Sequence, residues 1–323
     1  MPSLERELGI GVDLGATRVR VCVGDREGKL FWRKARKMPL PTKVGEYLGE
    51  IVSAIKEATS QIPRPAVLKG IGFASAGPLD RKRGALVKPA NLPYKYVPVV
   101  GPLEKEFGIF VTLVSDANAA ALGERRFGAG KEHENLVYIT LSSGIGGGAI
   151  VDGHLLAGKD GNATEIGHLV VDSAGRLTCG CGRKGHWEAY CSGNSIPRLA
   201  ALLASEEERT KGKMRVEGLL GVSGPVDSEV ILRAATAGNR FGMGVAKELG
   251  RLNALGVANA VNLFDPSLVT IGGGVALNNE ELVLGPIKKL APLYSVNRMP
   301  EIRITPLGDD AGLLGALSLA FCP

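Results

Sequence analysis

"LGIGVDLGATRVRVCVGD", which runs from Leu8 to Asp25, is the stretch of sequence that decides the fold. An apolar strand leads into a glycine turn, a second apolar strand follows, and the stretch closes on a tight polar turn at Gly24 and Asp25. This order predicts a β-hairpin. It does not fit a dinucleotide-binding fingerprint, because a strand stands where a helix should start.

The same design returns later in the chain. "NLVYITLSSGIGGGAIVDG" (Asn135 to Gly153) repeats the strand, glycine turn, strand and polar turn, and "LVTIGGGVA" (Leu268 to Ala276) is a third strand that runs into glycines. Helical patterns cover residues 44–62, the end of 115–130, 228–266 as two helices, and 311–321. The alternation predicts an α/β protein with partly parallel sheets, and the repeated hairpin predicts two related halves.

Composition narrows the class of protein. The chain has 323 residues, of which 45% are hydrophobic, so it can bury a sizeable core and disorder is not expected. No apolar run approaches the roughly 18 residues of a membrane span, and the N-terminus has no secretory signal pattern. We therefore expect a cytoplasmic protein without a membrane partner. Five cysteines, an odd number, argue against a disulfide framework in such a compartment.

The net charge of +6 is mild for this length. Basic residues gather in "FWRKARK" (Phe31 to Lys37) and "DRKRG" (Asp80 to Gly84), and we expect both stretches to be solvated hairpin turns. No element typical of nucleic-acid binding accompanies them, so a nucleic-acid partner is not expected. A basic surface also suits an anionic small molecule.

The glycine turns have the chemistry of phosphate sites. Consecutive backbone amides without side chains can point at an anion, as in "DLGAT" (Asp13 to Thr17) and "SSGIGGG" (Ser142 to Gly148). A carboxylate beside such a turn, here Asp13, suits a hydrated magnesium ion. A structural hairpin is the alternative for either turn taken alone.

The stretch "CGCGRKGHWE" (Cys179 to Glu188) has the residue types of a metal site, a redox pair or a polar loop. One residue between Cys179 and Cys181 is too few for the usual C-x-x-C redox pair. Cysteine and histidine are the ligands that zinc prefers, and four of them close a structural site. The candidate zinc ligands are His168, Cys179, Cys181 and His186. Chance clustering is the alternative, and Cys191 is expected to be a buried thiol.

In order along the chain, "DLGAT", "SDANAAALGE", "LSSGIGGG", "EIGH" and "CGCGRKGHWE" resemble the motifs of the ROK family of glucokinase-like sugar kinases and sugar-responsive repressors. The resemblance spans nearly the whole chain. It implies an actin-like (ribonuclease H-like), duplicated, two-lobe α/β fold with the active site in the cleft. It implies a small lobe at residues 1–114, to which the helix in 305–323 returns, and a large lobe at 115–304.

The resemblance also implies the roles of individual residues. Asp116 is the expected general base, whereas the residues alone would favour an aspartate that only caps the following helix. The expected sugar contacts are Gly77, Asn91, Ser115, Asp116, Glu165, His168 and Glu188. The expected contacts to ATP and magnesium are Asp13, Gly15, Ala16, Thr17, Ser143, Gly144, Gly146, Gly272, Gly273 and Gly274. The zinc ion is expected to shape the sugar pocket through His168.

Two positions depart from the family pattern. His186 stands where the family has a third cysteine, and Ser115 stands where it has an asparagine that helps to hold the sugar. The expected reaction is ATP-dependent phosphorylation of the 6-hydroxyl of a hexose, with glucose first and an N-acetylhexosamine such as N-acetylmannosamine as the alternative. A ROK repressor is a remote alternative, because no room for a DNA-binding segment precedes Asp13. A homodimer or homotetramer is expected by analogy.

Overall fold

The structure is a computed structural model that describes residues 6–15, 17–89, 92–211 and 215–322. The chain divides into two compact units. The first consists of Met1–Tyr138, Gly148–Thr164 and Thr305–Pro323, and the second of Ile139–Gly147 and Glu165–Ile304. Each unit is described by itself below.

The first unit is built on a five-stranded sheet with the order β3-β2-β1-β4-β8. Its strands are β1 (Arg6–Leu14), β2 (Arg18–Gly24), β3 (Leu30–Lys37), β4 (Ala66–Ser75) and β8 (Val111–Ser115). β1 pairs antiparallel with β2 and parallel with β4, so the predicted hairpin is confirmed. A small sheet of β5 (Leu79–Asp80), β6 (Ala85–Val87) and β7 (Tyr96–Pro98) follows β4.

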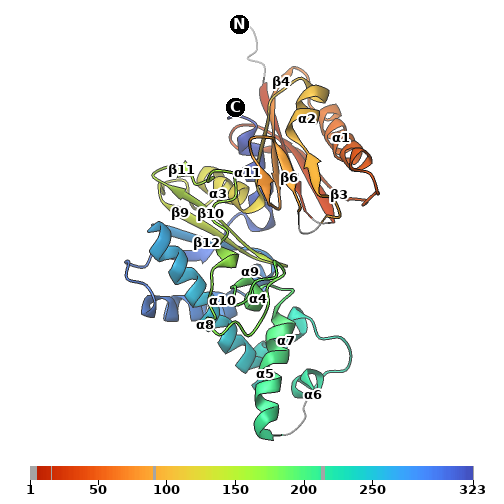
Figure 1. Cartoon of the computed structure of the whole chain (residues 1–323). Coiled ribbons are helices and arrows are strands. Elements are labelled where there is room, and N and C mark those ends of the chain that lie inside the picture. Colours follow the sequence, from red (N-terminus) through yellow and green to blue (C-terminus); the bar gives the residue numbers. More distant parts are fainter. Residues whose placement is uncertain (1–5, 16, 90–91, 212–214, 323) are drawn as a thin grey trace. The chain divides into compact units, whose positions relative to one another are not determined.

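One face of this sheet carries the apolar core of the unit. Leu8, Ile10 and Val12 alternate along β1, are fully buried and pack with the buried side of helix α1 (Val44–Ser60). Helix α2 (Val100–Phe107) contributes Leu103 to the same core. The strand period of two therefore sends each second residue of the opening stretch to the face covered by these helices (Figure 1).

The intervening residues of β1 face helix α11 (Ala311–Leu319) and are glycines. A Cβ atom added to Gly11 would lie 2.7 Å from the backbone nitrogen of Leu317, so the helix backbone rests directly on the strand. Asp13 is the next residue with the same orientation along β1, and it is 8% exposed. The glycine pattern thus places a carboxylate beside the N-terminal end of α11.

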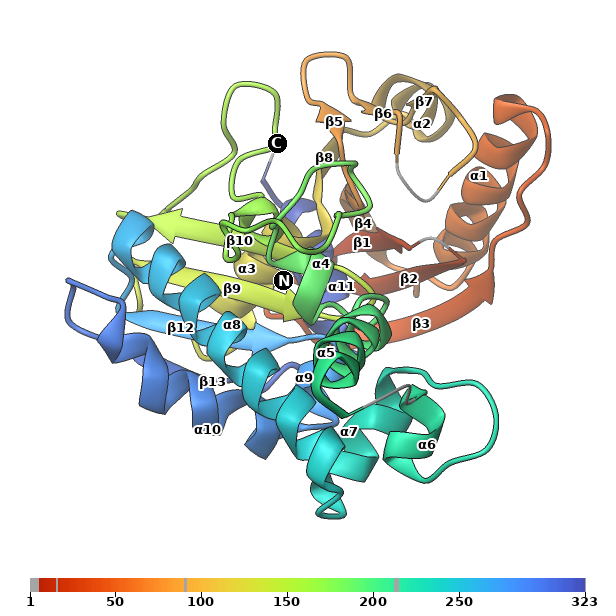
Figure 2. The same ribbon diagram turned by 60° about the horizontal axis from the view of Figure 1, so that its bottom comes forward.

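Helix α3 (Asp116–Phe127) packs equally closely on α11. A Cβ atom added to Gly315 would lie 1.6 Å from the carbonyl oxygen of Ala119, and one added to Gly123 would lie 2.4 Å from that of Ala311. Small residues on both helices let the two backbones approach each other; both helices are labelled in Figure 2.

A second five-stranded sheet has the order β11-β10-β9-β12-β13. Its strands are β9 (Leu136–Leu141), β10 (Ile145–Val151), β11 (His154–Leu155), β12 (Leu268–Gly272) and β13 (Glu301–Ile304). As in the first sheet, antiparallel strands lie on one side, here β10 with β11, and parallel strands on the other, here β12 with β13. The two sheets repeat one strand order, which confirms the predicted duplication.

Helices complete the second unit. They are η1 (Ile166–His168), α4 (Glu188–Cys191), α5 (Ile196–Lys211), α6 (Val216–Leu220), α7 (Ser228–Thr236), α8 (Arg240–Phe264), α9 (Gly274–Leu277), α10 (Glu280–Leu290) and η2 (Ala291–Leu293). The two helices expected within residues 228–266 are α7 and α8. Gly250 of α8 lies against Pro286 of α10, where an added Cβ would come within 2.5 Å of the proline ring.

One expectation about the basic stretches is wrong. Residues 31–37 belong to the edge strand β3 and do not form a turn. Lys34 pairs with Glu57 and Arg36 with Glu50, both on α1. Charged side chains on an edge strand oppose pairing with another chain, which explains a basic composition in a strand. Residues 81–84 do form a turn, as expected.

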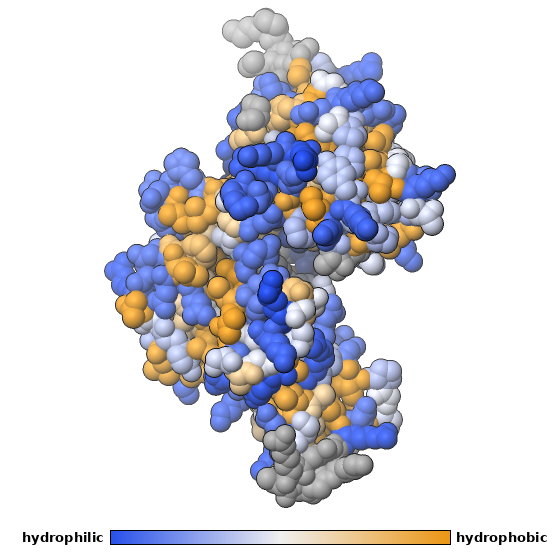
Figure 3. All heavy atoms as spheres, in the orientation of Figure 1, coloured by the Kyte–Doolittle hydropathy of each residue, from blue (hydrophilic) through white to orange (hydrophobic). Residues whose placement is uncertain are grey.

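Hydrophilic and hydrophobic residues are mixed on the face of each unit seen in Figure 3. Among the described residues, no helix combines the length and the apolar character that crossing a membrane requires. Cys191 is buried, as expected.

Because α3 and α11 are in backbone contact, we expect one added methyl group at Gly315 to lower the stability of the protein strongly. Gly315→Ala should destabilise the protein by roughly 3 kcal/mol, because the new Cβ would overlap a backbone oxygen that cannot move alone. Gly49→Ala, in the exposed part of α1 with no atom within 4 Å, is the matched control and should stabilise by about 0.5–1 kcal/mol. Urea unfolding of both variants checks this, and equal stability of the two would contradict the packing described.

Candidate active site and metal centre

In the first unit, Asp13 and Asp116 come together at the start of α11. Asp13 lies near the end of β1, and Asp116 is the first residue of α3. A Cβ atom added to Gly312 would lie 3.6 Å from Oδ2 of Asp13 and 3.8 Å from the backbone oxygen of Asp116. The two acidic residues predicted to serve phosphate and sugar chemistry therefore approach one glycine from two different elements.

Asp13 is engaged by an arginine. Oδ2 of Asp13 accepts hydrogen bonds from Nε of Arg20, at 3.0 Å, and from Nη2. Nη1 of the same guanidinium donates to the backbone oxygen of Asp309, at 2.6 Å. Arg20 comes from β2, the second strand of the opening hairpin, so the hairpin itself delivers both partners of the ion pair.

The start of α3 is capped by Ser115. Its Oγ accepts a hydrogen bond from the backbone nitrogen of Asn118, at 3.3 Å, and its backbone is extended as a capping residue requires. Asp116 follows inside the first turn, and its Oδ1 accepts from the nitrogen of Ala117, at 2.8 Å. The alternative in which Asp116 is the helix cap is therefore wrong. A carboxylate in the first turn also interacts favourably with the helix dipole.

The remaining candidates of the first unit lie in loops. The nitrogen of Gly15 donates to the oxygen of Arg18, at 2.9 Å, and the oxygen of Thr17 accepts from Met38, at 2.9 Å, so the first glycine turn is closed by backbone bonds. Gly77 lies two residues after the end of β4. Ala16 and Asn91 lie outside the described residues.

In the second unit, the second glycine turn is bound to α4 by a carboxylate. Oε2 of Glu188 accepts a hydrogen bond from the backbone nitrogen of Ile145, at 2.9 Å, and a Cβ added to Gly144 would lie 2.7 Å from the same oxygen. Gly167 in η1 also lies against the turn. A Cβ atom added to Gly167 would lie 2.1 Å from the backbone oxygen of Ile145. The glycines at 144 and 167 thus allow the turn, η1 and α4 to form one framework.

The other residues predicted to contact the nucleotide lie beside the same turn or at the end of β12. The oxygen of Ser143 accepts from the nitrogen of Asn194, at 3.4 Å, and Gly146 belongs to β10. Gly272 ends β12 and Gly274 begins α9. Gly273 between them has a φ of +86°, which favours glycine, and its added Cβ would lie 2.5 Å from the oxygen of Leu141.

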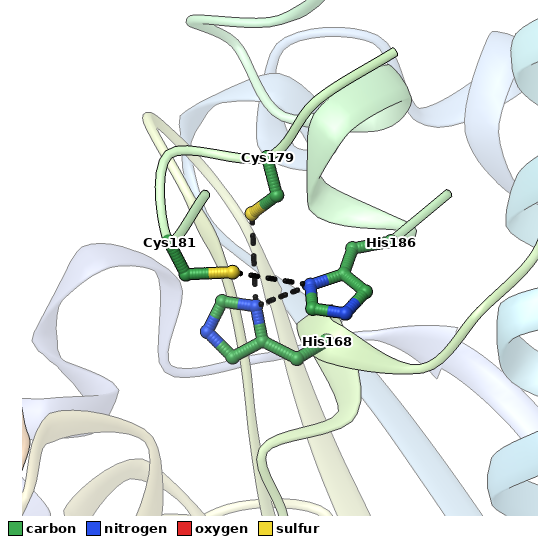
Figure 4. A group of neighbouring side chains, drawn as sticks. All are labelled: His168, Cys179, Cys181 and His186. Atoms are coloured by element: carbon green, nitrogen blue, oxygen red, sulfur yellow. Dashed lines mark hydrogen bonds between the residues drawn. The ribbon is translucent and has the colours of Figure 1, made fainter. Parts of the chain in front are cut away.

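The four predicted metal ligands converge (Figure 4). Their ligand atoms lie within 4.8 Å of one another. Nδ1 of His168 lies 3.2 Å from Nδ1 of His186 and 3.7 Å from Sγ of Cys179, and Sγ of Cys181 lies 3.3 Å from Nδ1 of His186. Tetrahedral zinc, with bonds of about 2.0–2.3 Å, would separate its ligand atoms by roughly 3.3–3.8 Å. The donor set and its spacing therefore fit a zinc ion.

Burial shifts the pKa values of two residues in this cluster. Burial raises the pKa of the Cys179 thiol to about 12, so a thiolate there needs a positive charge beside it. Burial and the neighbouring His168 lower the pKa of His186, which keeps its imidazole neutral, as a metal ligand must be. Nε2 of His168 lies 3.8 Å from Oε2 of Glu165. Burial raises the pKa of the Glu165 carboxyl, although the nearby His168 acts to lower it.

Polar contacts fix the base of the cysteine loop separately from its tip. Oδ2 of Asp172 accepts from the hydroxyl of Tyr190, at 2.6 Å, and from Nε of Arg176, at 3.0 Å. Arg176 also reaches Glu206 of α5 and Glu248 of α8. The base of the loop is thus tied to three helices, and only its tip carries Cys179, Cys181 and His186.

Sequence reasoning missed several residues of this arrangement. Arg20 gave no signal beyond its place in a strand, and Gly167 lay inside a motif from which only Glu165 and His168 were selected. Gly144 was predicted for phosphate contact, and that contact stays a prediction; its second constraint, that a side chain there would collide with Glu188, was not predicted. The hydrogen bond between Glu188 and Ile145 joins residues 43 positions apart, and no local sequence pattern predicts a bond over that separation.

Gly144→Ala should break the bond between Glu188 and the turn. The added Cβ would displace Oε2 of Glu188, and hydrogen exchange at the amide of Ile145 should become roughly tenfold faster, as the loss of a charged hydrogen bond worth about 1.5–3 kcal/mol allows. Gly180→Ala, in the cysteine loop with no atom within 4 Å, should leave this amide unchanged. Unchanged exchange in Gly144→Ala would show that the turn does not depend on Glu188.

Comparisons with known proteins agree with this arrangement of motifs. The ROK family model matches residues 9–321. The glucokinase of Streptomyces coelicolor is 36% identical over 319 residues, 97% of each chain. The crystal structure of the ROK hexokinase from Thermus thermophilus has 32% identity and a TM-score of 0.83 and covers 97% of this chain and 98% of its own.

A ROK family glucokinase from Streptomyces griseus, solved in complex with glucose and AMPPNP, has 34% identity and a TM-score of 0.74 with 97% and 98% coverage. The fold class expected from the sequence, actin-like and duplicated, is confirmed. The family model extends over nearly all of the sequence, and the match to the Streptomyces coelicolor glucokinase covers 97% of its length. The chain belongs to the ROK family.

Proposed function

We propose that this protein is an ATP-dependent sugar kinase that phosphorylates the 6-hydroxyl of a hexose, with glucose as the preferred sugar. The observation that carries the proposal is full-length similarity, at 36% identity, to a protein named glucokinase. It is supported by the approach of Asp13 and Asp116 to one point in the first unit. The glucose and AMPPNP bound to the Streptomyces griseus relative are the ligands that such a reaction requires.

In the proposed mechanism Asp116 is the general base. Its carboxylate accepts the proton of the sugar hydroxyl while that oxygen attacks the terminal phosphoryl group of ATP and ADP leaves. The cap at Ser115 and the hydrogen bond from the nitrogen of Ala117 hold the carboxylate in place at the start of α3. Phosphate oxygens are bound by backbone amides of the two glycine turns.

Magnesium and zinc have separate places in this proposal. Asp13 would hold magnesium, directly or through water, and the ion would offset the negative charge of the phosphates. Zinc bound by His168, Cys179, Cys181 and His186 would be structural, because four protein ligands leave no open position for water. It would fix His168, whose Nε2 and neighbour Glu165 then face the sugar together with Glu188.

The alternative substrate is an N-acetylhexosamine such as N-acetylmannosamine. The observation that favours it is Ser115, whose hydroxyl is committed to the helix cap and is shorter than the asparagine usual in the family. In this alternative the shorter side chain leaves space for an acetyl group. Parallel rate measurements with glucose, mannose, N-acetylmannosamine and N-acetylglucosamine, in ATP and magnesium, separate the two proposals. A kcat/KM for an acetylated sugar above that for glucose would overturn the preference stated.

The assembly and the lobes complete the proposal. We place the enzyme in the cytoplasm as a homodimer or homotetramer, with sugar and nucleotide as its ligands. The lobes are proposed as 1–114 with the helix in 305–323, and 115–304. Light scattering of the purified protein tests the assembly, and hydrogen exchange with and without glucose tests where the lobes meet.

Asp116→Asn should lower kcat by about 10²–10⁴-fold, since general-base catalysis contributes that much and an amide accepts no proton. Sugar affinity, measured by calorimetry, should stay within a few-fold of the original. Asp227→Asn, which changes an aspartate at the start of α7 to another good capping residue, is the matched control and should leave kcat unaltered. Turnover of Asp116→Asn near that of the control would remove Asp116 from the mechanism.

Metal analysis should find about one zinc ion per chain. Cys181→Ser should lose it, because a serine hydroxyl is a poor zinc ligand, whereas His186→Cys should retain it with the ligand set usual in the family. Cys322→Ser, an exposed cysteine outside the cluster, is the control. Equal zinc content in Cys181→Ser and Cys322→Ser would refute the proposed ligand set.

A further inference from the structure

Arg20 and Arg33 lie on the face of the first sheet that α11 covers. Cys22 of β2 packs with Leu313 and Leu317 of α11, and Arg33 of β3 is directly opposite Cys22. Arg20 is two residues before Cys22 and shares its orientation. The two arginines are thus diagonal neighbours that reach toward the start of α11.

Their partners differ. Nη1 of Arg33 binds Oδ2 of Asp310, at 2.7 Å, and the Arg33 side chain is 62% exposed, as in an ordinary surface ion pair. The Arg20 side chain is 33% exposed, and its partner Asp13 is 10% exposed. All three guanidinium nitrogens of Arg20 are used, two on Asp13 and one on the backbone of Asp309. Of these two arginines, it is therefore Arg20 that joins the hairpin, Asp13 and the segment before α11.

The bonds of Arg20 determine how Asp13 can act. Both bonds go to Oδ2, so the carboxylate is fixed in one orientation and Oδ1 is the oxygen left for another partner. A buried carboxylate beside a triphosphate would otherwise repel it, and the guanidinium offsets that charge. The bond to Asp309 holds η3 (Gly308–Asp310), and through it the start of α11, beside Asp13 and Asp116.

We propose that Arg20 is a positioning residue of the nucleotide site, which orients Asp13 and offsets its charge so that a metal-bound nucleoside triphosphate can bind. This rests on the proposed kinase function. Arg20 acts through Asp13 and is not assigned a contact with the nucleotide. The geometry distinguishes it from Arg33, which binds the same turn without touching Asp13.

The test is calorimetric titration of the full chain with AMPPNP in Mn²⁺, which needs no turnover. Arg20→Gln should weaken binding about tenfold, as the loss of a residue that supports a metal ligand commonly does. Arg20→Lys, which keeps the charge but cannot make three bonds, should recover part of the loss. Arg33→Gln, the matched control, should bind as the original chain does and should lose little thermal stability, because its ion pair is exposed.

A double-mutant cycle then shows whether Arg20 acts through Asp13. In Asp13→Asn, the further change Arg20→Gln should cause little additional loss of affinity. Unchanged binding in Arg20→Gln, or an equal loss in Arg33→Gln, would overturn the proposal. So would a full additional loss in the Asp13→Asn background, which would indicate direct contact with the nucleotide. An original chain that binds AMPPNP but phosphorylates no sugar would refute the proposed function and leave this test intact.

Discussion

The backbone of α11 lies against β4 and α3 with no side chains between them, and the candidate site of the first unit depends on that contact. A Cβ atom at Gly72 would lie 1.7 Å from the oxygen of Ala316, and one at Gly315 would lie 1.6 Å from the oxygen of Ala119. A residue of any other type would push the helix away. Asp116 begins α3, and Asp13 lies on β1, where Gly11 meets the backbone of α11 at Leu317. The same close packing therefore brings Oδ2 of Asp13 and the backbone oxygen of Asp116 to one residue of α11, Gly312.

Helix α3 also holds two of the four points where the chain crosses between the units. The chain crosses after Tyr138, after Gly147, after Thr164 and before Thr305, and both threonines form hydrogen bonds with buried side chains of α3. Oγ1 of Thr164 lies 3.4 Å from Oδ1 of Asn118, and Oγ1 of Thr305 donates to Glu124. Thr164 has a φ of +64°, which is strained for a β-branched residue and persists only where its surroundings impose it. The helix that begins at Asp116 is therefore also the anchor of two connections.

The parts of this structure that could be predicted from the sequence are those with a local pattern. The hairpin at Leu8, the helices around residue 240 and the four metal ligands follow from period, turn residues and ligand type within short windows. Arg20 binding Asp309 and Thr305 binding Glu124 join residues more than 180 positions apart, and such pairs leave no periodic signal. The edge strand β3 was misjudged because its charges resemble those of a turn, and only its pairing with β2 identifies it.

The cysteine loop separates what polar bonds can do from what a metal would add. Its base is fixed by Asp172, Arg176 and Tyr190 without any metal ligand, and Tyr190 lies two residues after Glu188 on α4. Glu188 is held at the second glycine turn by the hydrogen bond that its Oε2 accepts from Ile145, and its Oε1 accepts a hydrogen bond from Sγ of Cys179, at 3.5 Å. His168 shares its Nδ1 with the cluster at the tip. A zinc ion at the tip would therefore act on the sugar through His168 and would also reach the glycine turn through Cys179 and Glu188. In the proposed enzyme, the structural metal and the phosphate turn are neighbours in one unit, and Glu188 is the side chain that joins them.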